Sequence, residues 1–231
     1  MPEEARTDVW VPEVLDFEEA RELKKRTLTT RLLRYWWAWC VIHQTDPRPE
    51  LVFDLGCGSG YGSRIMVEQH DNLVVCGLDS NEVALAVARQ EFAIQGKTDF
   101  RRVNLDVEWI GQFYNMRPQV VVAFDLFERL VHRDAFLLYL SQMLPDSGQF
   151  LLSTENTLNR DTTFRPDAPL HICYARSDLL SLLRRFFRVV RVYGQQDFPG
   201  KDWLDQVNAK RRYPLGKELI ACAEPFKEKK K

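Results

Sequence analysis

The chain has 231 residues, of which 45% are hydrophobic, and a formal net charge of −1. A chain of this length and composition can bury one full hydrophobic core, so we expect a single domain of ordinary size. The balanced charge gives no global excess of basic residues, which argues against nucleic acid as a partner.

The cysteines and the chain start indicate a cytoplasmic protein. There are five cysteines, an odd number, and none has CxxC spacing, which suits reduced thiols better than disulfides or a zinc site. The first residues, MPEEARTD, do not resemble a secretory signal. The most apolar early stretch, Leu32 to Ile42, is too short to span a bilayer, so no membrane insertion is expected.

A leading helix is the first predicted element. Leucine, alanine and tryptophan residues recur at near-helical spacing over residues 16–44, and Pro47 and Pro49 follow. This helix forms an N-terminal helical cap over residues 1–45. Strands and helices then alternate, with strands expected at 51–55, 73–78, 100–105, 119–124, 148–153, 187–193 and 218–223, and helices at 61–69, 81–94, 133–143 and 177–186.

This alternation predicts an α/β fold with a parallel sheet. The runs VVVAF at 120–124 and FLLS at 150–153 are continuously apolar, as expected of strands that are buried on both faces. We expect a single-domain, doubly wound sheet of seven mostly parallel strands, with an antiparallel edge strand and helices on both faces. The core domain spans 46–223, with a long excursion at 194–217, and 224–231 is a charged tail.

A glycine-rich loop follows the first strand. The segment VFDLGCGSGYGS at 52–63 has a glycine at every second position from Gly56 to Gly62. Such a loop lets a ligand touch the backbone at the start of the next helix. The spacing fits neither the dinucleotide motif GxGxxG nor a P-loop. Asp54, two residues before the first glycine, suits a ligand that carries an ammonium group rather than a pyrophosphate.

Two further carboxylates follow the next strands. Asp79 ends the second strand, where open α/β sheets place the acid that binds a ribose diol. Asp106 closes the predicted third strand, although an ordinary turn aspartate explains it about equally well. Carboxylates at three successive strand ends, above a glycine loop, suit a ligand with an amino acid part, a ribose and an adenine.

The motifs resemble those of the class I S-adenosylmethionine-dependent methyltransferases. The resemblance extends over about residues 31–223 and is carried by VFDLGCGSGYGS, GLDSNEVALAVAR, FDLFERLVH and LPDSGQFLLSTEN. The branch that looks most similar acts on saccharides, lipids and other small molecules. It shares the glycine loop CGxGYGS, an Arg-Tyr pair in the leading helix, here Arg34 and Tyr35, and the ending FRVVRVYGQ at 187–195.

The resemblance implies a Rossmann-like fold, S-adenosylmethionine as cofactor and S-adenosylhomocysteine as product. It implies that Asp54 and the glycine backbone hold the methionine part and that Asp79 accepts hydrogen bonds from the ribose. Asp106 would meet the adenine amino group, and Asp125 would border the methyl group. The full implied set for the cofactor is Asp54, Gly56, Cys57, Gly58, Gly60, Tyr61, Asp79, Ser80, Asp106, Val107, Asp125 and Phe127, the last as a wall.

The catalytic side departs from the family pattern. The family has Glu-His in the fourth motif, but this chain has Glu128 followed by Arg129. Transfer to a hydroxyl needs a base, and histidine is the usual choice near neutral pH. The candidate catalytic residues are His132, His171, Asp125 and Glu128, although each histidine is equally well explained as an ordinary loop residue.

The acceptor is expected to be a small molecule, sugar-like or a secondary metabolite, methylated on oxygen or nitrogen. Arg34 and Tyr35 combine a cation and an aromatic ring and are predicted to reach the pocket mouth as substrate residues. Residues 156–174 are predicted to form a lid over the acceptor. The sequence leaves the oligomeric state open.

Two other functions are compatible with the sequence. A small-RNA 2′-O-methyltransferase would use a divalent metal, with Asp125, Glu128 and His171 as ligands. Arg129 stands where that class has a ligand histidine, and its positive charge opposes metal binding, so no metal is expected. The altered fourth motif also allows a non-catalytic protein that only binds the cofactor.

Overall fold

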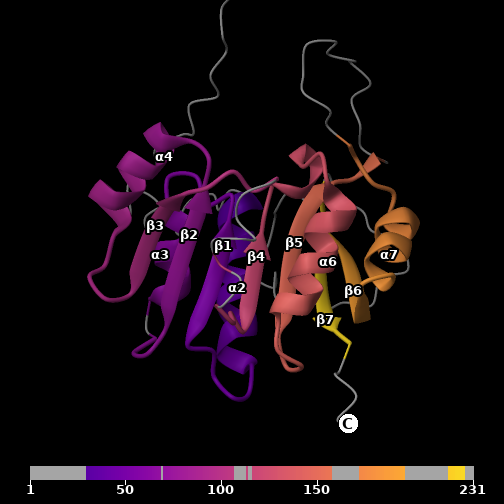
Figure 1. The fold of residues 1–231 in the computed structure, drawn as a ribbon, viewed down its shortest axis with the longest axis horizontal. Helices are drawn as coiled ribbons and strands as arrows, with labels where there is room; N and C mark the ends of the chain where they lie inside the picture. Colours follow the sequence, from indigo (N-terminus) through magenta and orange to yellow (C-terminus); the bar gives the residue numbers. More distant parts are fainter. Residues whose placement is uncertain are drawn as a thin grey trace, which may run out of the picture.

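One seven-stranded sheet organises the described part of the chain, which comprises residues 30–68, 70–106, 113, 116–157, 172–195 and 218–226 of the computed structural model. The strand order across the sheet is β3-β2-β1-β4-β5-β7-β6 (Figure 1). The strands are β1 (Leu51–Leu55), β2 (Val74–Asp79), β3 (Thr98–Arg102), β4 (Val120–Ala123), β5 (Gln149–Glu155), β6 (Phe187–Gln195) and β7 (Glu218–Pro225). The helices are α2 (Thr30–Gln44), α3 (Tyr61–Val67), α4 (Glu82–Val87), the π-helix η1 (Ala88–Phe92), the 3-10 helix η2 (Phe127–Arg129), α6 (Arg133–Met143) and α7 (Arg176–Arg184).

The predicted fold class is confirmed, and the structure locates its antiparallel strand. Strands β3, β2, β1, β4 and β5 are parallel neighbours, and β7 pairs antiparallel with both β5 and β6. The antiparallel strand therefore lies one position inside the edge, and β6 is the outermost strand. An antiparallel return needs no crossover helix, which fits the absence of a helical pattern between the last two predicted strands.

Side chains alternate between two apolar layers, one on each face of the sheet. Val52 and Val75 point to the face that packs against α2 and α3. Phe53 and Cys76 point to the opposite face, which is covered by α6 and α7. This alternation has the period of two that a strand imposes, and it explains why the central strands carry apolar residues on both faces.

Most predicted boundaries are shifted by one or two residues, and two of the differences bear on the site. The third strand was expected at 100–105, but β3 ends at Arg102 because it pairs only with β2, which ends opposite it at Asp79. The helix expected at 81–94 is α4 followed by η1, whose wider turn is a π-helix. The consequence for function is that Asp106 lies in a turn beyond β3 and not at a strand end.

The predicted domain boundaries are only partly within the described residues. In the N-terminal cap 1–45, the structure describes α2 from Thr30, and most of the predicted lid 156–174 and of the excursion 194–217 lies outside the described residues. The charged tail expected at 224–231 is wrong at its start, because β7 continues to Pro225 through its pairing with β6.

The ends of these long connections lie at one edge of the sheet. Asn156 forms a bridge with Tyr174, and Glu218 pairs with both Glu155 and Gln195. Both connections therefore leave and return at the carboxyl end of β5, the same edge at which the loops after β1, β2 and β4 lie. The chain reverses its winding direction between β1 and β4, and open α/β sheets bind ligands at this switch point. Within the described residues, no helix has the length and apolar character needed to cross a bilayer.

Candidate functional site

The glycine loop connects β1 to α3 through a backbone that other residues rarely adopt. Gly56, Gly58 and Gly60 have φ values of 74°, 53° and 86°, all in the left-handed region that favours glycine. At Gly60 a Cβ atom would also lie 2.7 Å from the Cβ of Ala88 and 2.8 Å from the ring of Phe100. The loop is therefore folded tightly onto η1 and β3, and it offers backbone rather than side chains to a ligand. The Cys57 side chain is buried beneath it.

Asp79 anchors this loop from the end of β2. Its Oδ2 accepts a hydrogen bond from the Gly58 N–H at 2.8 Å, and its Oδ1 accepts one from the Asn81 N–H at 2.8 Å. The side chain of Asn81 caps α4, which leaves Asp79 partly exposed beside the loop. Ser80, also expected at the cofactor, is exposed next to it. A carboxylate held in this way is oriented to accept further hydrogen bonds from hydroxyl groups.

Asp54 is a fully buried carboxylate beneath the loop. Its Oδ2 accepts a hydrogen bond from Ser63 Oγ at 2.6 Å, and its Oδ1 accepts one from the Tyr35 hydroxyl at 3.3 Å. The pKa of Asp54 is raised to about 7, chiefly by burial; the hydrogen bonds from Ser63 and Tyr35 lower it, and the nearby charge of Asp79 raises it. Both donors are neutral hydroxyls, so they do not neutralise the negative charge of the buried carboxylate. A cationic ligand above the loop would compensate that charge.

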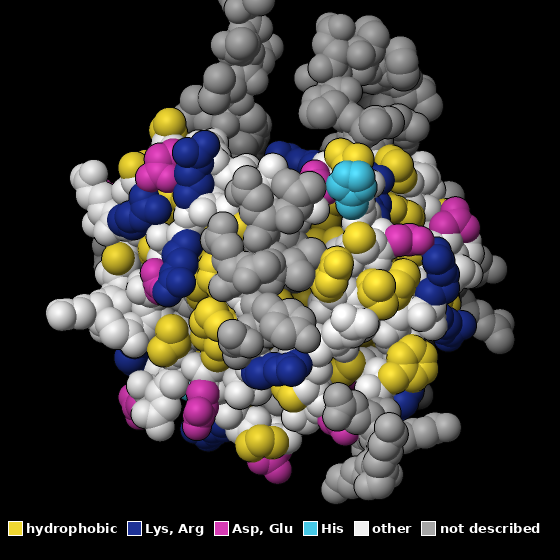
Figure 2. Space-filling view, in the orientation of Figure 1, with side chains coloured by type: hydrophobic (Ala, Val, Ile, Leu, Met, Phe, Trp, Pro, Cys, Tyr) yellow, Lys and Arg dark blue, Asp and Glu magenta, His cyan; other side chains and the backbone are white. Residues whose placement is uncertain are grey.

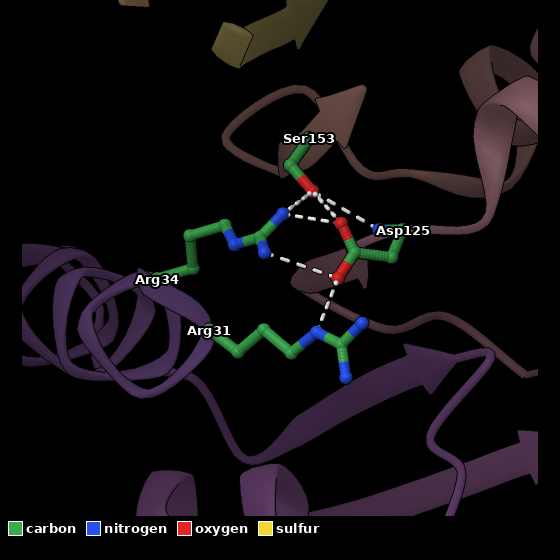
Figure 3. A network of polar contacts seen from close by, with 4 residues as sticks. All are labelled: Arg31, Arg34, Asp125 and Ser153. Atoms are coloured by element: carbon green, nitrogen blue, oxygen red, sulfur yellow. Dashed lines mark hydrogen bonds and ion pairs between the residues drawn. The ribbon is translucent and has the colours of Figure 1, made fainter. Parts of the chain in front are cut away.

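A charge network lies across the switch point from the loop, at the end of β4 (Figure 3). Arg34 donates through Nη1 to Asp125 Oδ1 and through Nη2 to Asp125 Oδ2 at 3.0 Å, and Arg31 Nε lies 3.4 Å from the same Oδ2. Ser153 on β5 accepts from Arg34 Nη1 at 2.6 Å and from the Asp125 N–H at 3.0 Å. Bidentate guanidinium–carboxylate pairs have a fixed geometry, so this network joins α2 to β4 and β5.

Asp125 adopts a strained backbone in this network. Its φ of 54° makes it the single described residue other than glycine with a positive φ. Such a conformation costs free energy and is kept where surrounding contacts determine it, often at functional sites. Here the Ser153 hydroxyl holds the N–H of Asp125, and the two arginines hold its carboxylate.

The prediction that Arg34 and Tyr35 reach the pocket mouth is wrong. Arg34 is 2% exposed and Tyr35 is 5% exposed, because α2 packs with these side chains toward the sheet. Arg34 holds Asp125, and Tyr35 reaches Asp54 beneath the loop. The ring of Tyr61, at the start of α3, packs edge-on against that of Tyr35, and burial raises the pKa of Tyr61 to about 12. Arginine and tyrosine thus act from inside the protein and not at its surface.

Asp106 does not lie at the end of a strand but binds the backbone just before α6. Its Oδ1 accepts hydrogen bonds from the N–H groups of Val131 at 2.8 Å and His132 at 3.1 Å, just before α6. Asp106 therefore fixes the start of α6 and brings His132 to the carboxyl edge of the sheet. Val107, expected beside the adenine, lies outside the described residues.

The remaining predicted residues differ in exposure. Phe127, the residue expected to wall the cofactor, is completely buried against the rings of Phe136 and Tyr174. Glu128 is also buried, at 2% exposure, which removes it from contact with an acceptor in this conformation. His132 is exposed at the edge, and His171 lies outside the described residues.

Three residues of the site were not predicted from the sequence. Ser63, Ser153 and Arg31 contribute hydrogen bonds or an ion pair to the two acidic groups. Ser153 is a polar residue within the apolar run of β5, and this is a signal that could have identified it. Ser63 and Arg31 have no such local signal, because surface helices commonly carry serine and arginine.

The described residues contain no group of three or more histidine, cysteine, aspartate or glutamate side chains arranged to hold a metal ion. Asp125, one of the ligands required by the RNA-type hypothesis, has its carboxylate between two guanidinium groups. Their positive charge opposes a divalent cation at the same oxygens.

Comparisons with known proteins agree with this geometry. Residues 53–150 match the family model described as a methyltransferase domain. The match assigns a methyltransferase domain to these residues. A "Probable S-adenosylmethionine-dependent methyltransferase" of Mycolicibacterium smegmatis is 30% identical over 127 residues, covering 54% of this chain and 45% of the relative. The ubiquinone biosynthesis O-methyltransferase of Pseudomonas aeruginosa is 30% identical over 138 residues, covering 58% of this chain and 53% of the relative.

Solved structures of other proteins have the same fold as this methyltransferase domain. The plantazolicin methyltransferase BpumL, in complex with a triazolic desmethylPZN analog and SAH, has a TM-score of 0.65 and 16% identity. The match covers 89% of this chain and 89% of that protein. The chain spans about half the length of the curated relatives that it matches.

We predict that Asp79→Ala weakens binding of S-adenosylhomocysteine about ten- to a hundredfold, because hydrogen bonds to a charged group contribute about 1.5–3 kcal/mol each. The substitution removes the acceptor for ribose hydroxyls and releases the Gly58 N–H. Titration calorimetry measures the affinity directly. Asp99→Ala is a matched control, because Asp99 is paired with Arg101 on the neighbouring strand β3. An affinity equal to that of the wild type would remove Asp79 from the site.

We predict that Asp54 makes the stability of the cofactor-free methyltransferase domain fall as the pH rises. Its folded pKa of about 7 lies above the ordinary value of 3.8, so the folded chain keeps a proton that the unfolded chain has lost. The contribution is complete below about pH 4 and is lost as the pH passes through 7.

The measurement is urea unfolding, followed by tryptophan fluorescence, of the wild type and of Asp54→Asn between pH 4 and 8. Because the variant lacks this titration, the stability of the wild type relative to the variant should fall by about 2–4 kcal/mol over that range. The other carboxylates are common to both proteins and cancel in the difference. Parallel pH profiles would show that the folded protein does not hold a proton on Asp54.

Proposed function

We propose that the protein transfers the methyl group of S-adenosylmethionine to an oxygen or nitrogen of a small molecule, sugar-like or a secondary metabolite. The observation that carries this proposal is the position of the glycine loop and Asp79 on one side of the switch point and of Asp125 on the other. The two sides meet at one sheet edge, as transfer between two bound molecules requires.

The residues fit the cofactor that the domain implies. The left-handed glycines leave the loop backbone beside Asp79 open to a ligand. The buried Asp54 receives hydrogen bonds only from neutral hydroxyls among the contacts described above, which suits a ligand that brings a positive charge. S-adenosylmethionine supplies a methyl group on a sulfonium, a good leaving group. The contribution of the protein is then mainly to hold the reacting atoms in line, an effect that is worth on the order of 7 kcal/mol in good cases.

A small acceptor is supported by the surface and by the relatives. On the face shown in Figure 2, lysine and arginine side chains lie in small separate groups among acidic and apolar ones. RNA recognition depends on concentrated positive charge along the phosphate backbone, and this face does not offer it. The similar proteins named above include an O-methyltransferase of ubiquinone biosynthesis and a methyltransferase solved with a desmethylPZN analog.

The residues that select the acceptor are proposed to come from the connections at 156–174 and 194–217. Their ends are held together at the carboxyl end of β5, on the same edge as Asp125. Asp125 itself is proposed to position the acceptor rather than to take its proton, because both carboxylate oxygens are bound by guanidinium groups. When oxygen is methylated, the hydroxyl proton must pass to another base.

For an oxygen acceptor, we predict that replacing the base by alanine lowers kcat by about 10²–10⁴. His132 is the described candidate, since it is exposed at the edge and its backbone is fixed by Asp106. His171 is the second candidate. Transfer of labelled methyl groups to a panel of hydroxyl and amine acceptors measures the effect, and S-adenosylhomocysteine affinity should stay within about twofold. Full turnover in both His132→Ala and His171→Ala would indicate an amine or carboxylate acceptor.

We also predict that transfer needs no divalent ion, because Arg129 replaces a ligand histidine and Asp125 is paired with two arginines. Activity should survive dialysis against a chelator. Loss of activity that manganese or magnesium restores would favour the RNA 2′-O-methyltransferase instead. Cofactor binding without transfer to any acceptor in the panel would favour a non-catalytic binding protein.

A further inference from the structure

Tyr35 connects α2 to the underside of the cofactor loop. Its hydroxyl donates to Asp54 Oδ1 at 3.3 Å, across the interface between α2 and β1. The side chain is 5% exposed and belongs to the apolar layer between α2, α3 and the sheet. No part of this contact involves the upper surface of the loop, where a ligand would lie.

The same ring explains the last glycine of the 52–63 segment. A Cβ atom at Gly62 would lie 2.1 Å from Cζ of Tyr35 and 2.2 Å from Cε1, closer than real Cβ contacts come. Gly62 lies in the first turn of α3 and, unlike the three glycines before it, is not among the positive-φ residues. A glycine is therefore needed at position 62 to make room for Tyr35, and not to form the loop.

Two more rings fix Tyr35 in place. Its ring meets that of Tyr61 edge-on at a centroid distance of 5.5 Å and that of Phe124 at 5.1 Å. Tyr61 is the first residue of α3, directly after Gly60, and Phe124 directly precedes Asp125. One aromatic side chain thus contacts the acid beneath the loop, the helix that follows the loop and the strand end that carries Asp125.

We propose that Tyr35 is a positioning residue for the cofactor loop: by holding Asp54 and the first turn of α3, it sets cofactor affinity without touching the cofactor. Edge-on aromatic pairs and a hydrogen bond to a buried carboxylate restrict the ring to one orientation. The loop between Asp54 and Tyr61 is then held at both of its ends by contacts to the same side chain. This role is independent of the identity of the acceptor.

The test compares two aromatic residues of α2 that each donate one hydrogen bond. Tyr35→Phe removes the donor to Asp54, whereas Trp39→Phe removes the donor to the Glu68 carbonyl oxygen, 3.0 Å away at the other end of α3. We expect Tyr35→Phe to raise the Kd for S-adenosylhomocysteine about three- to tenfold and Trp39→Phe to leave it within about twofold, as measured by titration calorimetry. Thermal unfolding of both variants shows how much stability each one loses.

A purely structural tyrosine gives a different result. Tyr35→Phe would then lower the melting temperature as Trp39→Phe does, with unchanged S-adenosylhomocysteine affinity, and this outcome overturns the proposal. A wild-type chain that binds no S-adenosylhomocysteine overturns the cofactor assignment and this proposal together. Binding by the wild type with loss in Tyr35→Phe supports it whether or not an acceptor is found.

A second pair of variants tests the contact at Gly62. Gly62→Ala should weaken S-adenosylhomocysteine binding about tenfold or more, because the new methyl group displaces the Tyr35 ring or the start of α3. In the double variant Gly62→Ala/Tyr35→Ala the methyl group has room, so affinity should recover to that of Tyr35→Ala alone. Additive losses of affinity in the double variant would show that the Tyr35 ring does not transmit the effect of Gly62→Ala on binding. If Gly62→Ala does not fold, the comparison of Tyr35→Phe with Trp39→Phe still decides the proposal.

Discussion

The burial of the Asp54 carboxylate is the constraint on which the arrangement of the site depends. A carboxylate without access to water must receive hydrogen bonds, and here α2 and α3 each supply one hydroxyl, from Tyr35 and Ser63. Those bonds require both helices to pack closely on the end of β1, and the ring of Tyr35 then requires a glycine at position 62. The glycine loop lies between these fixed points, so its conformation follows from the packing beneath it.

A second constraint acts on the other side of the switch point. Arg34 is adjacent to Tyr35 in α2, yet it reaches Asp125 at the end of β4, where Ser153 completes the network. A buried guanidinium left without its carboxylate is costly, so α2 cannot move away from β4 and β5 without breaking this pair. Helix α2 is therefore tied to both halves of the site by neighbouring residues, and the distance between the halves is set by the helix backbone.

Topology brings the remaining parts to the same edge. Parallel strands place the ends of β1, β2, β4 and β5 together, and the pairing of β7 with β5 and β6 returns the long connections to that edge. Asp106 contributes differently from the prediction: β3 ends early because its partner β2 ends, and the freed carboxylate instead holds the start of α6. The position of His132 at the edge depends on that contact.

The sequence by itself determined the alternation of strands and helices, the mostly parallel sheet, the glycine loop and its cofactor, because these depend on local periodicity, backbone conformation and short motifs. It did not determine the direction of the side chains on α2. Successive helical residues point about 100° apart, and which of them face inward depends on how the helix docks on the sheet. Arg34 and Tyr35 were expected at the pocket mouth for this reason, and only the tertiary structure shows them as the buried partners of Asp125 and Asp54. Gly62 could not be separated from the loop glycines for the same reason, since the ring that requires it comes from another helix.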